Sequence, residues 1–502
     1  MSWTRPRSPA WLVPAALAWL LGGCPVEPLD RPPAPEALGP RGLELYLPAG
    51  RVAALGAILL EQLRATDQAE LRARLPSLAG TLGGGQASYG LPEQELGLAL
   101  EVILLTPLDG GLQLSASLAG PEASWALDLL PLEGEARTCA LGVHGPARSL
   151  ELAWQLHADA AGRPVLLPTG QAVLSGEPGV VELAQDCTVL DTGALRAEIG
   201  QALEAALQAG LPGLVADLGS AAGGVLGLDA GGAGSVSAGF RFSFLTDGTA
   251  AALTGGRLRL GLVGGFEGDR AECVPPGLAP PAPGAGGLAG FADLLPGSGQ
   301  AYGLALAVPH ATLVQGLCAA HRAGLLCRRV DEVPLEGVSL TELLPSLEAL
   351  GSLNGARVAV WPEAAPELSL EPPGEPGERL PRAVLRLPGV GVDVYADLDG
   401  ADVRVLGCEA ELFLTLVPSL DAEGLRVRLV ETRVGNLEIG FALLPDESGP
   451  ALRQAAAALL GQAAGVLVDG LGPLALPLPA AGRGEVLEAW TEAQAVVIYL
   501  EP

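Results

Sequence analysis

The sequence predicts an α+β protein made of two related halves, and three observations support this. A strand-and-helix segment near the start of the chain returns about halfway along it. In each half, apolar residues alternate with polar ones over long stretches, a period of two that indicates sheet with one apolar face. A proline-rich linker, Pro275–Pro283, separates the halves. Each half should therefore contain a strand, a helix, several antiparallel strands and a long helix.

The repeat begins with a strand. Gly42–Pro48 (GLELYLP) returns 261 positions later as Gly303–Pro309 (GLALAVP). In both copies an amphipathic helix follows, and a second apolar helix closes each half. Because four elements recur in the same order, the chain contains an internal repeat. The apolar residues that mark these helices are Val52, Leu55, Ile58, Leu59, Leu63, Leu195, Ile199, Leu203 and Leu207 in the first half, and Leu313, Val314, Leu317, Leu452, Ala456, Leu459 and Leu460 in the second.

The strands of each half are predicted by alternation and by turn residues. In the first half, a strand ends at the turn Asp109–Gly111, and in the second a strand ends at the turn Asp399–Gly400. The alternating residues expected to face the interior include Leu96, Leu98, Leu100, Val102, Leu104, Leu112, Leu114, Val392, Val394, Ala396, Ala410, Leu412 and Leu414.

The N-terminus has the zones of an export signal. Arg5 and Arg7 precede the apolar segment Trp11–Leu21, and Leu21-Gly22-Gly23-Cys24 then matches a lipobox. We expect cleavage before Cys24 and lipidation of its thiol. The alternatives are an ordinary signal peptide with an incidental cysteine, or a short membrane helix. Pro25, in place of the aspartate associated with inner-membrane retention, favours the outer membrane or cell surface.

The charge excludes some partners. The net charge is −28, and all 29 basic residues are arginine. Nucleic acid is therefore not expected as a partner, and neither is a strongly anionic lipid surface. The mean hydropathy of +0.38 with only 17% charged residues is high for a water-exposed chain. Since aromatic residues make up 4% of the sequence, aliphatic side chains must form the interior.

No motif for catalysis or for a cofactor occurs. The chain has four histidines, His144, His157, His310 and His321, and no HExxH, P-loop or G-x-S-x-G motif. Asp397, Asp399 and Asp402 lack the spacing of a calcium loop and are better explained by a hairpin turn. We therefore predict a protein that is not an enzyme and that needs no metal or cofactor. An envelope hydrolase is the remaining enzymatic alternative.

The second half contains a series of segments in a recognisable order. These are Ala307–His310, Ala323–Leu326, Val338–Thr341 with Leu344–Leu347, Leu425–Asn436 and Gly472–Pro479 (GPLALPLP). The series resembles the family of bactericidal/permeability-increasing protein, lipopolysaccharide-binding protein and cholesteryl ester transfer protein, the tubular lipid-binding fold.

The resemblance implies two pseudo-symmetric, highly twisted antiparallel β-barrels, each with two long helices, joined by a central β-sheet in an elongated molecule. The implied division is residues 1–23 signal peptide, 24–40 proline-rich tether, 41–220 first barrel, 221–300 central strands and linker, 301–480 second barrel, and 481–502 final strand of the central sheet.

The resemblance also implies binding or transfer of lipids or other hydrophobic molecules in an apolar channel of each barrel. The ligand would be a phospholipid or another molecule with an acyl chain. The alternative is a structural or surface-interaction lipoprotein with side-chain-filled barrels. Residues expected to contact the ligand are Leu47, Val52, Leu55, Leu59, Leu195, Ile199, Leu203, Val308, Leu313, Leu317, Leu452, Ala456 and Leu459.

Two departures from the family matter. The acidic, lysine-free sequence argues against lipopolysaccharide as the ligand, because family members that bind it present a basic tip. The family's first-barrel disulfide reaches the long helix, but residues 193–215 contain no cysteine, so Cys139 is expected to pair with Cys187.

Four other cysteines should also form disulfides in an exported protein. A helix ending near Ala323 favours the pair Cys318–Cys327, which leaves Cys273 with Cys408.

The lipobox gives a direct prediction. Replacing Cys24 with serine removes the thiol that is acylated, and more than one acyl chain is needed for stable anchoring. We expect Cys24→Ser protein to leave the membrane fraction or to accumulate unprocessed. Mass spectrometry of the wild-type N-terminal peptide checks the acylation; an unacylated peptide together with unchanged fractionation of the variant would refute it.

Overall fold

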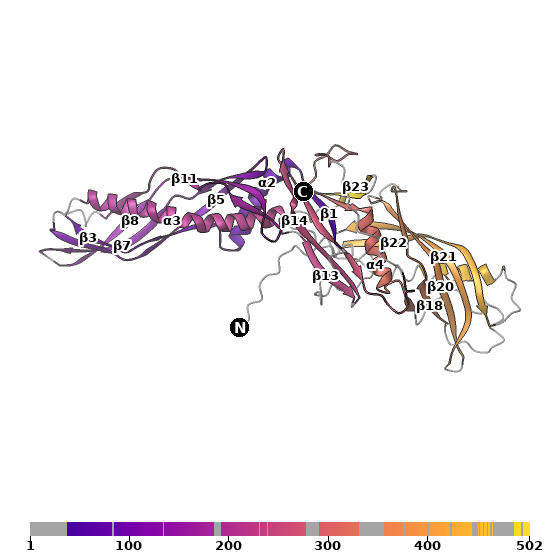
Figure 1. Cartoon of the computed structure of the whole chain (residues 1–502). Helices are drawn as coiled ribbons and strands as arrows, with labels where there is room; N and C mark the ends of the chain where they lie inside the picture. The colour runs from indigo at the N-terminus through magenta and orange to yellow at the C-terminus, as the bar shows by residue number, and fades with distance from the viewer. Residues whose placement is uncertain are drawn as a thin grey trace. The chain divides into compact units, whose positions relative to one another are not determined.

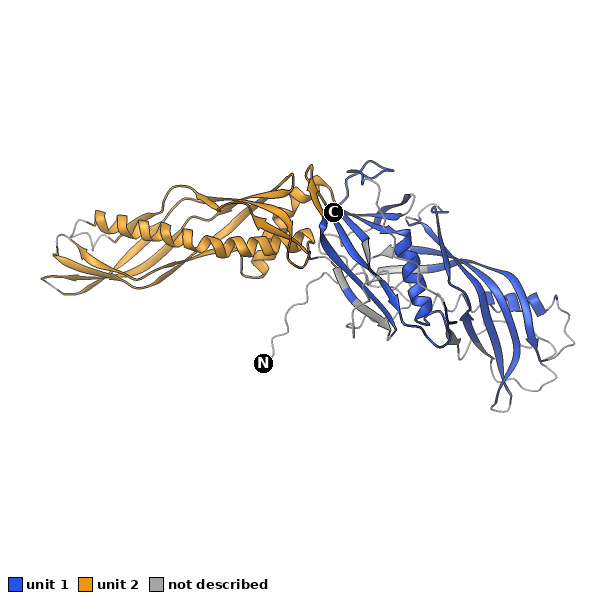
Figure 2. Ribbon diagram, in the orientation of Figure 1, with its two compact units in different colours: residues 1–46, 229–250, 259–502 blue, residues 47–228, 251–258 orange. Residues whose placement is uncertain are grey.

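The computed structural model describes residues 38–502, except for 83–84, 134, 185–191, 230, 238, 278–290, 331–355, 376–377, 379, 399–400, 422–423, 444–449, 451, 455, 459, 462–463, 465–485, 493–494 and 502. The chain forms two compact units (Figure 2). Unit 2 is Leu47–Leu228 with Ala251–Leu258, and unit 1 is Met1–Tyr46, Asp229–Ala250 and Arg259–Pro502. The predicted cleavage site at Cys24 lies outside the described residues.

Unit 2 consists of two antiparallel sheets and two helices, α2 (Ala49–Ala65) and α3 (Gly193–Leu226). One sheet has the order β10-β9-β6-β5-β2, with β11 beside β9, and the other has the order β12-β8-β7-β4-β3. The strands are β2 (Glu70–Leu75), β3 (Leu78–Leu82), β4 (Ala87–Leu91), β5 (Gln94–Leu108), β6 (Gly111–Leu118), β7 (Glu122–Pro131), β8 (Arg137–His144), β9 (Arg148–Ala158), β10 (Pro164–Pro168), β11 (Val173–Ser175) and β12 (Val180–Leu183).

The predicted alternation in β5 is correct only for its first half. Leu96, Leu98 and Leu100 are buried, but Val102 and Leu104 are exposed. The register of β5 against β6 shifts between Leu100 and Val102. Such a bulge moves every later side chain to the opposite face. The interior is reached by Ile103 and Leu105 instead of Val102 and Leu104.

Helix α3 packs one face inside unit 2. Among the described residues it is the one helix long and apolar enough to cross a membrane. Its buried side chains recur every three or four positions, for example Ile199, Leu203 and Leu207, as expected for a helix that covers a sheet. It runs along the strands of the unit (Figure 1) and contacts β2, β10 and β12. These contacts account for its apolar face.

Unit 1 contains a seven-stranded sheet that joins the two halves of the repeat. Its strand order is β13-β14-β15-β1-β16-β24-β23. The first strands of the two repeats, β1 and β16, pair antiparallel in the middle, with Leu45 opposite Leu306. Strands from the end of each half flank this pair, with β15 beside β1 and β24 beside β16. The predicted repeat is therefore confirmed, and the arrangement has a pseudo-two-fold axis. The strands are β1 (Gly39–Leu47), β13 (Gly231–Ser237), β14 (Phe240–Thr254), β15 (Arg257–Gly268), β16 (Leu304–Pro309), β23 (Val486–Glu492) and β24 (Ala495–Leu500).

The rest of unit 1 is a curled antiparallel sheet, here called the C-terminal sheet (Figure 1). Its order is β17-β18-β20-β21-β22, with β19 beside β20. Helix α4 (His310–Arg322) and helical residues between 450 and 464 accompany it. The molecule is thus α+β, with curled antiparallel sheets and helices in each half. The strands are β17 (Arg328–Val330), β18 (Ala356–Pro362), β19 (Glu367–Glu371), β20 (Arg382–Leu398), β21 (Ala401–Asp421) and β22 (Gly424–Ala442).

The disulfide prediction for unit 1 is wrong. Cys273 is bonded to Cys327, and Cys318 and Cys408 are free. Gly324, at φ 78°, ends α4 in the left-handed conformation and turns the chain back. The backbone N–H of Ala271 then donates to the Arg322 carbonyl at 2.8 Å, which holds Cys273 beside this turn. Cys318 lies one helical turn before the end of α4 and does not face the returning chain.

In unit 2, Cys139 is disulfide-bonded. Its expected partner, Cys187, lies outside the described residues, so this pairing stays a prediction.

The bridge should be a major source of stability for unit 1. It closes a loop of 54 residues, which corresponds to about 4 kcal/mol in the chain-entropy model. Cys273→Ser with Cys327→Ser should lower the free energy of unfolding by roughly that amount in a denaturant titration. Cys318→Ser should cost roughly 1 kcal/mol or less. Peptide mapping without reduction that finds Cys318 or Cys408 bridged would contradict the assignment.

Candidate functional site

The inner face of the C-terminal sheet is a continuous apolar surface. Side chains of β20 and β21 form its buried centre, and α4 and the helical residues 450–464 pack against them. The sequence predicts one face for the latter helix, and Leu452, Ala456, Leu460 and Ala464 are indeed spaced four apart and buried. The buried members are Leu317, Leu385, Leu387, Val390, Val392, Val394, Ala396, Val405, Leu406, Cys408, Ala410, Leu412, Leu414, Leu452, Ala456, Leu460 and Ala464.

The described residues cover one side of this surface only in part. On β22, the edge strand in the sheet order, five apolar residues pack against the cluster but remain only half-buried: Leu429, Val434, Leu437, Ile439 and Ala442. We call these five residues the β22 strip. On β20 and β21, by contrast, nearly all inward side chains are buried, Leu416 near the end of β21 being half-buried.

Three bulges in the pairing of β21 with β22 determine which side chains of β22 face the apolar cluster. The register of β22 against β21 shifts between Gly407 and Cys408, between Glu409 and Glu411, and between Thr415 and Leu416. Each extra residue would turn the following side chains outward, but the apolar residues change phase at the same places. As a result, Leu429 lies opposite Leu416, Val434 opposite Leu412, and Ile439 opposite Cys408. The bulges also bend the strand and increase its twist.

Charged residues of β22 are kept off the strip. Arg428, Glu431, Arg433 and Glu438 are exposed and alternate with the strip residues. The β22 strip is therefore uncharged along its length, which suits contact with a hydrocarbon chain and not with a polar head group.

On the outer face, a cross-strand ladder holds the three long strands in register. Arg386, Phe413 and Arg433 are direct neighbours on β20, β21 and β22. The two guanidinium groups lie 5.8 Å and 5.5 Å from the ring centroid of Phe413. Arg386 also pairs with Glu367 at 2.7 Å and with Glu411. Cation–π and charge-assisted contacts of this kind stabilise the sheet without help from its inner face.

Helix α4 packs between the seven-stranded sheet, here called the central sheet, and the C-terminal sheet. A Cβ on Gly316 would lie 3.1 Å from the Phe266 ring, so the helix approaches β15 closely. On its other side, the imidazole Nε2 of His310 bonds the Leu368 carbonyl at 2.9 Å, and that of His321 bonds the Pro362 carbonyl at 3.2 Å. Burial lowers the pKa of His321.

The apolar face offers little chemistry. Cys408 belongs to the cluster, and burial, followed by the Asp393 carboxylate, raises the pKa of its thiol to about 11. Within the described ranges, no three His, Cys, Asp or Glu side chains are grouped so as to hold a metal ion. Asp397 lies opposite Asp402 in the β20–β21 pairing, as the hairpin interpretation requires.

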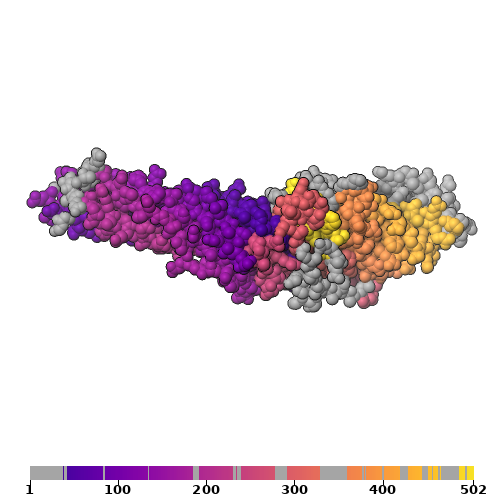
Figure 3. Space-filling model, turned by 90° about the horizontal axis from the view of Figure 1, so that it is seen from above, coloured from indigo at the N-terminus to yellow at the C-terminus, as the bar shows by residue number. Residues whose placement is uncertain are grey.

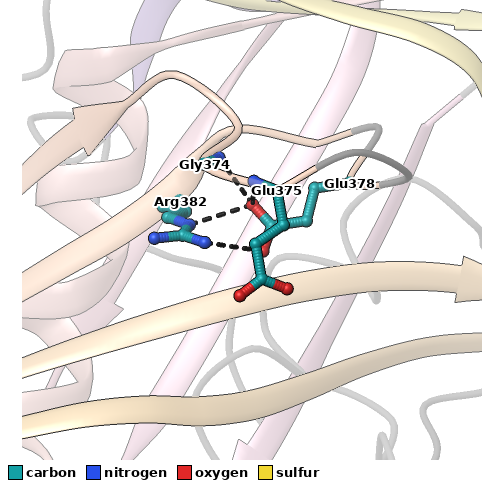
Figure 4. A network of polar contacts seen from close by, with 4 residues as sticks. All are labelled: Gly374, Glu375, Glu378 and Arg382. Atoms are coloured by element: carbon teal, nitrogen blue, oxygen red, sulfur yellow. Dashed lines mark hydrogen bonds and ion pairs between the residues drawn. The ribbon is translucent and has the colours of Figure 1, made fainter.

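The loop before β20 is closed by one carboxylate (Figure 4). Glu378 accepts hydrogen bonds from the backbone N–H of Gly374 at 2.7 Å and from Arg382 Nε and Nη2, both at 2.9 Å. Chiefly because of the bonds from Arg382, the pKa of Glu378 is lowered to about 2. A carboxylate that stays ionised over the physiological range fastens this loop and does not act as a general acid.

The predicted contact residues of the second half fall in different places. Leu317, Leu452 and Ala456 belong to the apolar cluster. Leu313 is half-buried on α4, and Val308 is buried in β16, where it pairs with Val496 of the central sheet. Leu459 lies outside the described residues.

The predicted contact residues of the first half are all buried, in two separate groups. Leu47 lies just before α2, Val52, Leu55 and Leu59 lie within α2, and Leu195, Ile199 and Leu203 lie in the first third of α3. Leu203 is 3.6 Å from the Cβ position of Gly179, whereas α2 meets α3 near Gly224, where a Cβ would lie 3.8 Å from Gln62. These points are roughly 30 Å apart along α3. The two groups do not line one common space.

The β22 strip was missed at the sequence level. Its residues follow no single alternation, because the phase changes at each bulge. The usable signal is that β21 alternates regularly and that apolar residues of β22 follow its inward positions, with Thr432 opposite Leu414 as the exception, once extra residues are allowed at Val430, Asn436 and Gly440. Asn436, with a φ of 46°, marks one such position.

The buried His321 of α4 predicts that the stability of the protein depends on pH. Because the folded state lowers the pKa of His321, unfolding takes up a proton below the unfolded value of 6.5. Stability is therefore complete above about pH 6.5 and falls as pH decreases from there towards the folded pKa. His321→Gln, which keeps a donor for the Pro362 carbonyl, should flatten this dependence in thermal unfolding between pH 7.5 and 5.5. Equal slopes for the two proteins would refute the assignment.

Comparisons with known proteins find solved structures that are similar at low sequence identity. No family model matches the chain, and no curated protein matches its sequence. A crystal structure of lipopolysaccharide binding protein is similar at 12% identity, covering 92% of this chain and 98% of that one, with a TM-score of 0.48. P47 of Clostridium botulinum E1 has 7% identity, 92% and 100% coverage and a TM-score of 0.23. Takeout 1 of Epiphyas postvittana has 11% identity, 30% and 73% coverage and a TM-score of 0.16.

Proposed function

We propose that this chain binds a lipid or another hydrophobic molecule by laying its acyl chain on the inner face of the C-terminal sheet. The observation that carries the proposal is the β22 strip, five apolar side chains that continue a buried apolar cluster yet stay half-exposed. An apolar surface that a protein leaves open in this way commonly marks a binding site.

The affinity would come from desolvation. Covering apolar surface is worth roughly 25 cal/mol per Å², or about 0.8 kcal/mol for each buried methylene. Since the strip carries no charge, the head group of the ligand would remain outside it. A net charge of −28 without any lysine disfavours phosphate-rich head groups. A phospholipid with a neutral or zwitterionic head group, or a simple acyl ligand, fits better than lipopolysaccharide.

We further propose that the protein works while held on a bacterial envelope membrane, at the outer membrane or the cell surface. The support for this is the export signal and the lipobox ending at Cys24. Residues 25–40, rich in proline, would then form a stiff tether between the anchor and the folded units. Transfer of the ligand between membranes would build on the same site.

A non-enzymatic role is favoured over the envelope hydrolase. The two histidines of α4, His310 and His321, are each engaged by a strand carbonyl, of Leu368 and of Pro362. The structural alternative, a lipoprotein with barrels filled by side chains, is favoured by one observation in unit 2, where the predicted contact residues are fully packed. It does not account for the open strip in unit 1.

A matched pair of substitutions tests the site. Ile439 lies in the strip and Glu438, its neighbour in sequence, is exposed on the other side of β22. Ile439→Arg places a guanidinium where the acyl chain would lie, at a cost of several kcal/mol if it stays unpaired. It should reduce bound ligand by roughly tenfold or more, since 1.4 kcal/mol already corresponds to a factor of ten. Glu438→Arg should leave binding unchanged.

The measurement is native mass spectrometry on full-length protein purified without detergent, with lipid extraction as a second readout. Wild-type protein that carries no lipid and takes up no fluorescent fatty acid would refute the proposal and leave the structural role. Equal loss in both variants would place the ligand elsewhere.

A further inference from the structure

The interior of unit 2 differs from the C-terminal half in one respect that bears on ligand capacity. Leu55, Leu59 and Ile199 each have 0% of their surface exposed. A side chain without exposure touches protein over its whole surface, so no space as large as a water molecule adjoins it. The inward residues of β5, β6, β7 and β9 are likewise buried. None of the strip residues on β22 is buried to this degree.

At two points the helices of unit 2 pack directly against the backbone of the strands. A Cβ on Gly56 of α2 would collide with the carbonyl oxygen of Ile103 on β5. A Cβ on Gly210 of α3 would likewise collide with the carbonyl oxygen of Arg72 on β2. Helix backbone and strand backbone are therefore in direct contact at two places, and an acyl chain cannot pass between them there.

Two buried aromatic side chains of unit 2 lie against α3, one from each sheet. Trp154 of β9 is buried, and its indole Nε1 lies 3.5 Å from the Cβ position of Gly219 on α3. The buried Tyr89 of β4 lies over Gly80, and its hydroxyl donates to Glu198 of α3 at 2.6 Å. These contacts close the space between α3 and both sheets of the unit. The face of unit 2 in Figure 3 is a continuous surface of side chains.

A buried ion pair fastens the same helix. Arg148 of β9 is buried and makes two hydrogen bonds to Glu204 of α3, one of 2.9 Å. It also donates to the Glu177 carbonyl at 3.2 Å. Parting α3 from the sheet would leave a buried guanidinium unpaired, which costs several kcal/mol. Opening unit 2 for a ligand is therefore expensive.

The C-terminal half has the opposite character. Helical residues between 450 and 464 face the sheet with Leu452, Ala456, Leu460 and Ala464. Along β22, the half-exposed strip runs from Leu429 to Ala442, which at the usual rise spans about 40 Å. This is the one extended apolar surface on the inner side of either half that the described residues leave open.

We infer that the protein binds its ligand in the C-terminal half alone, that the acyl chain enters sideways over the β22 strip, and that unit 2 is a closed body without a ligand channel. The inference rests on the proposed function and restricts it: the two halves share one fold, but only one has capacity for a lipid.

A photoactivatable ligand tests this on the full-length protein. Palmitic acid carrying a diazirine on its chain is added to delipidated protein, the bound stoichiometry is counted by native mass spectrometry, and the cross-linked peptides are mapped after illumination. We expect adducts confined to residues 382–464 and absent from residues 47–228.

The possible failures are distinguishable. Protein that binds no palmitic acid at all overturns the proposed function together with the inference. Adducts within residues 47–228 overturn the inference while leaving lipid binding in place. Adducts at β21 and β22 that disappear in Ile439→Arg and persist in Glu438→Arg support it.

Discussion

The antiparallel pairing of β1 with β16 is the constraint on which the rest of the structure depends. These strands begin the two halves of the repeat, and they lie side by side with Glu44 opposite Ala307 and Tyr46 opposite Ala305. Each is then flanked by the hairpin that ends its own half. Both ends of each half are strands of one sheet, so the chain between them must leave this sheet and return to it. The curled sheets and their helices form these intervening segments.

A common frame does not require a common interior. In the first half, Gly56 and Gly210 bring helix backbone onto strand backbone, and Trp154 fills the gap that remains. In the second half, β20, β21 and β22 have 17, 21 and 19 residues. Among the described residues, the apolar side chains of the edge strand β22 remain half-buried. Packing against helices stabilises the first. In the second, Arg386, Phe413 and Arg433 also link neighbouring strands on the outer face.

Elements with a regular period could be predicted from the sequence, whereas local irregularities could not. The repeat, the amphipathic helices and most strands follow from spacing alone, since burial imposes a period of 3.6 or 2. Val102 was placed inward, but one extra residue after Leu100 turns it outward. The same effect, three times over, concealed the β22 strip. A bulge depends on the partner strand, which a pattern along one segment does not contain.

The disulfide error has a related cause. Spacing along α4 suggested that Cys318 and Cys327 would meet, but the outcome depends on Ala271, which comes from the far side of the linker and hydrogen-bonds the end of the helix. Likewise, predicted contact residues such as Ile199 and Leu55 were correctly expected to be buried. Whether burial means a ligand or a packed core is decided by neighbours that are distant in sequence.

The free thiol of Cys408 has a consequence for how the chain matures. Cys273, Cys318, Cys327 and Cys408 allow three ways of forming two bridges, yet among them the bond is between Cys273 and Cys327. Exchange proceeds through the thiolate, and the pKa of about 11 keeps Cys408 protonated once it is buried between β20 and β22. If this part of the sheet forms before oxidation is complete, Cys408 is withdrawn from exchange. The folding order of the sheet, and not the cysteine positions alone, then selects the correct bridge.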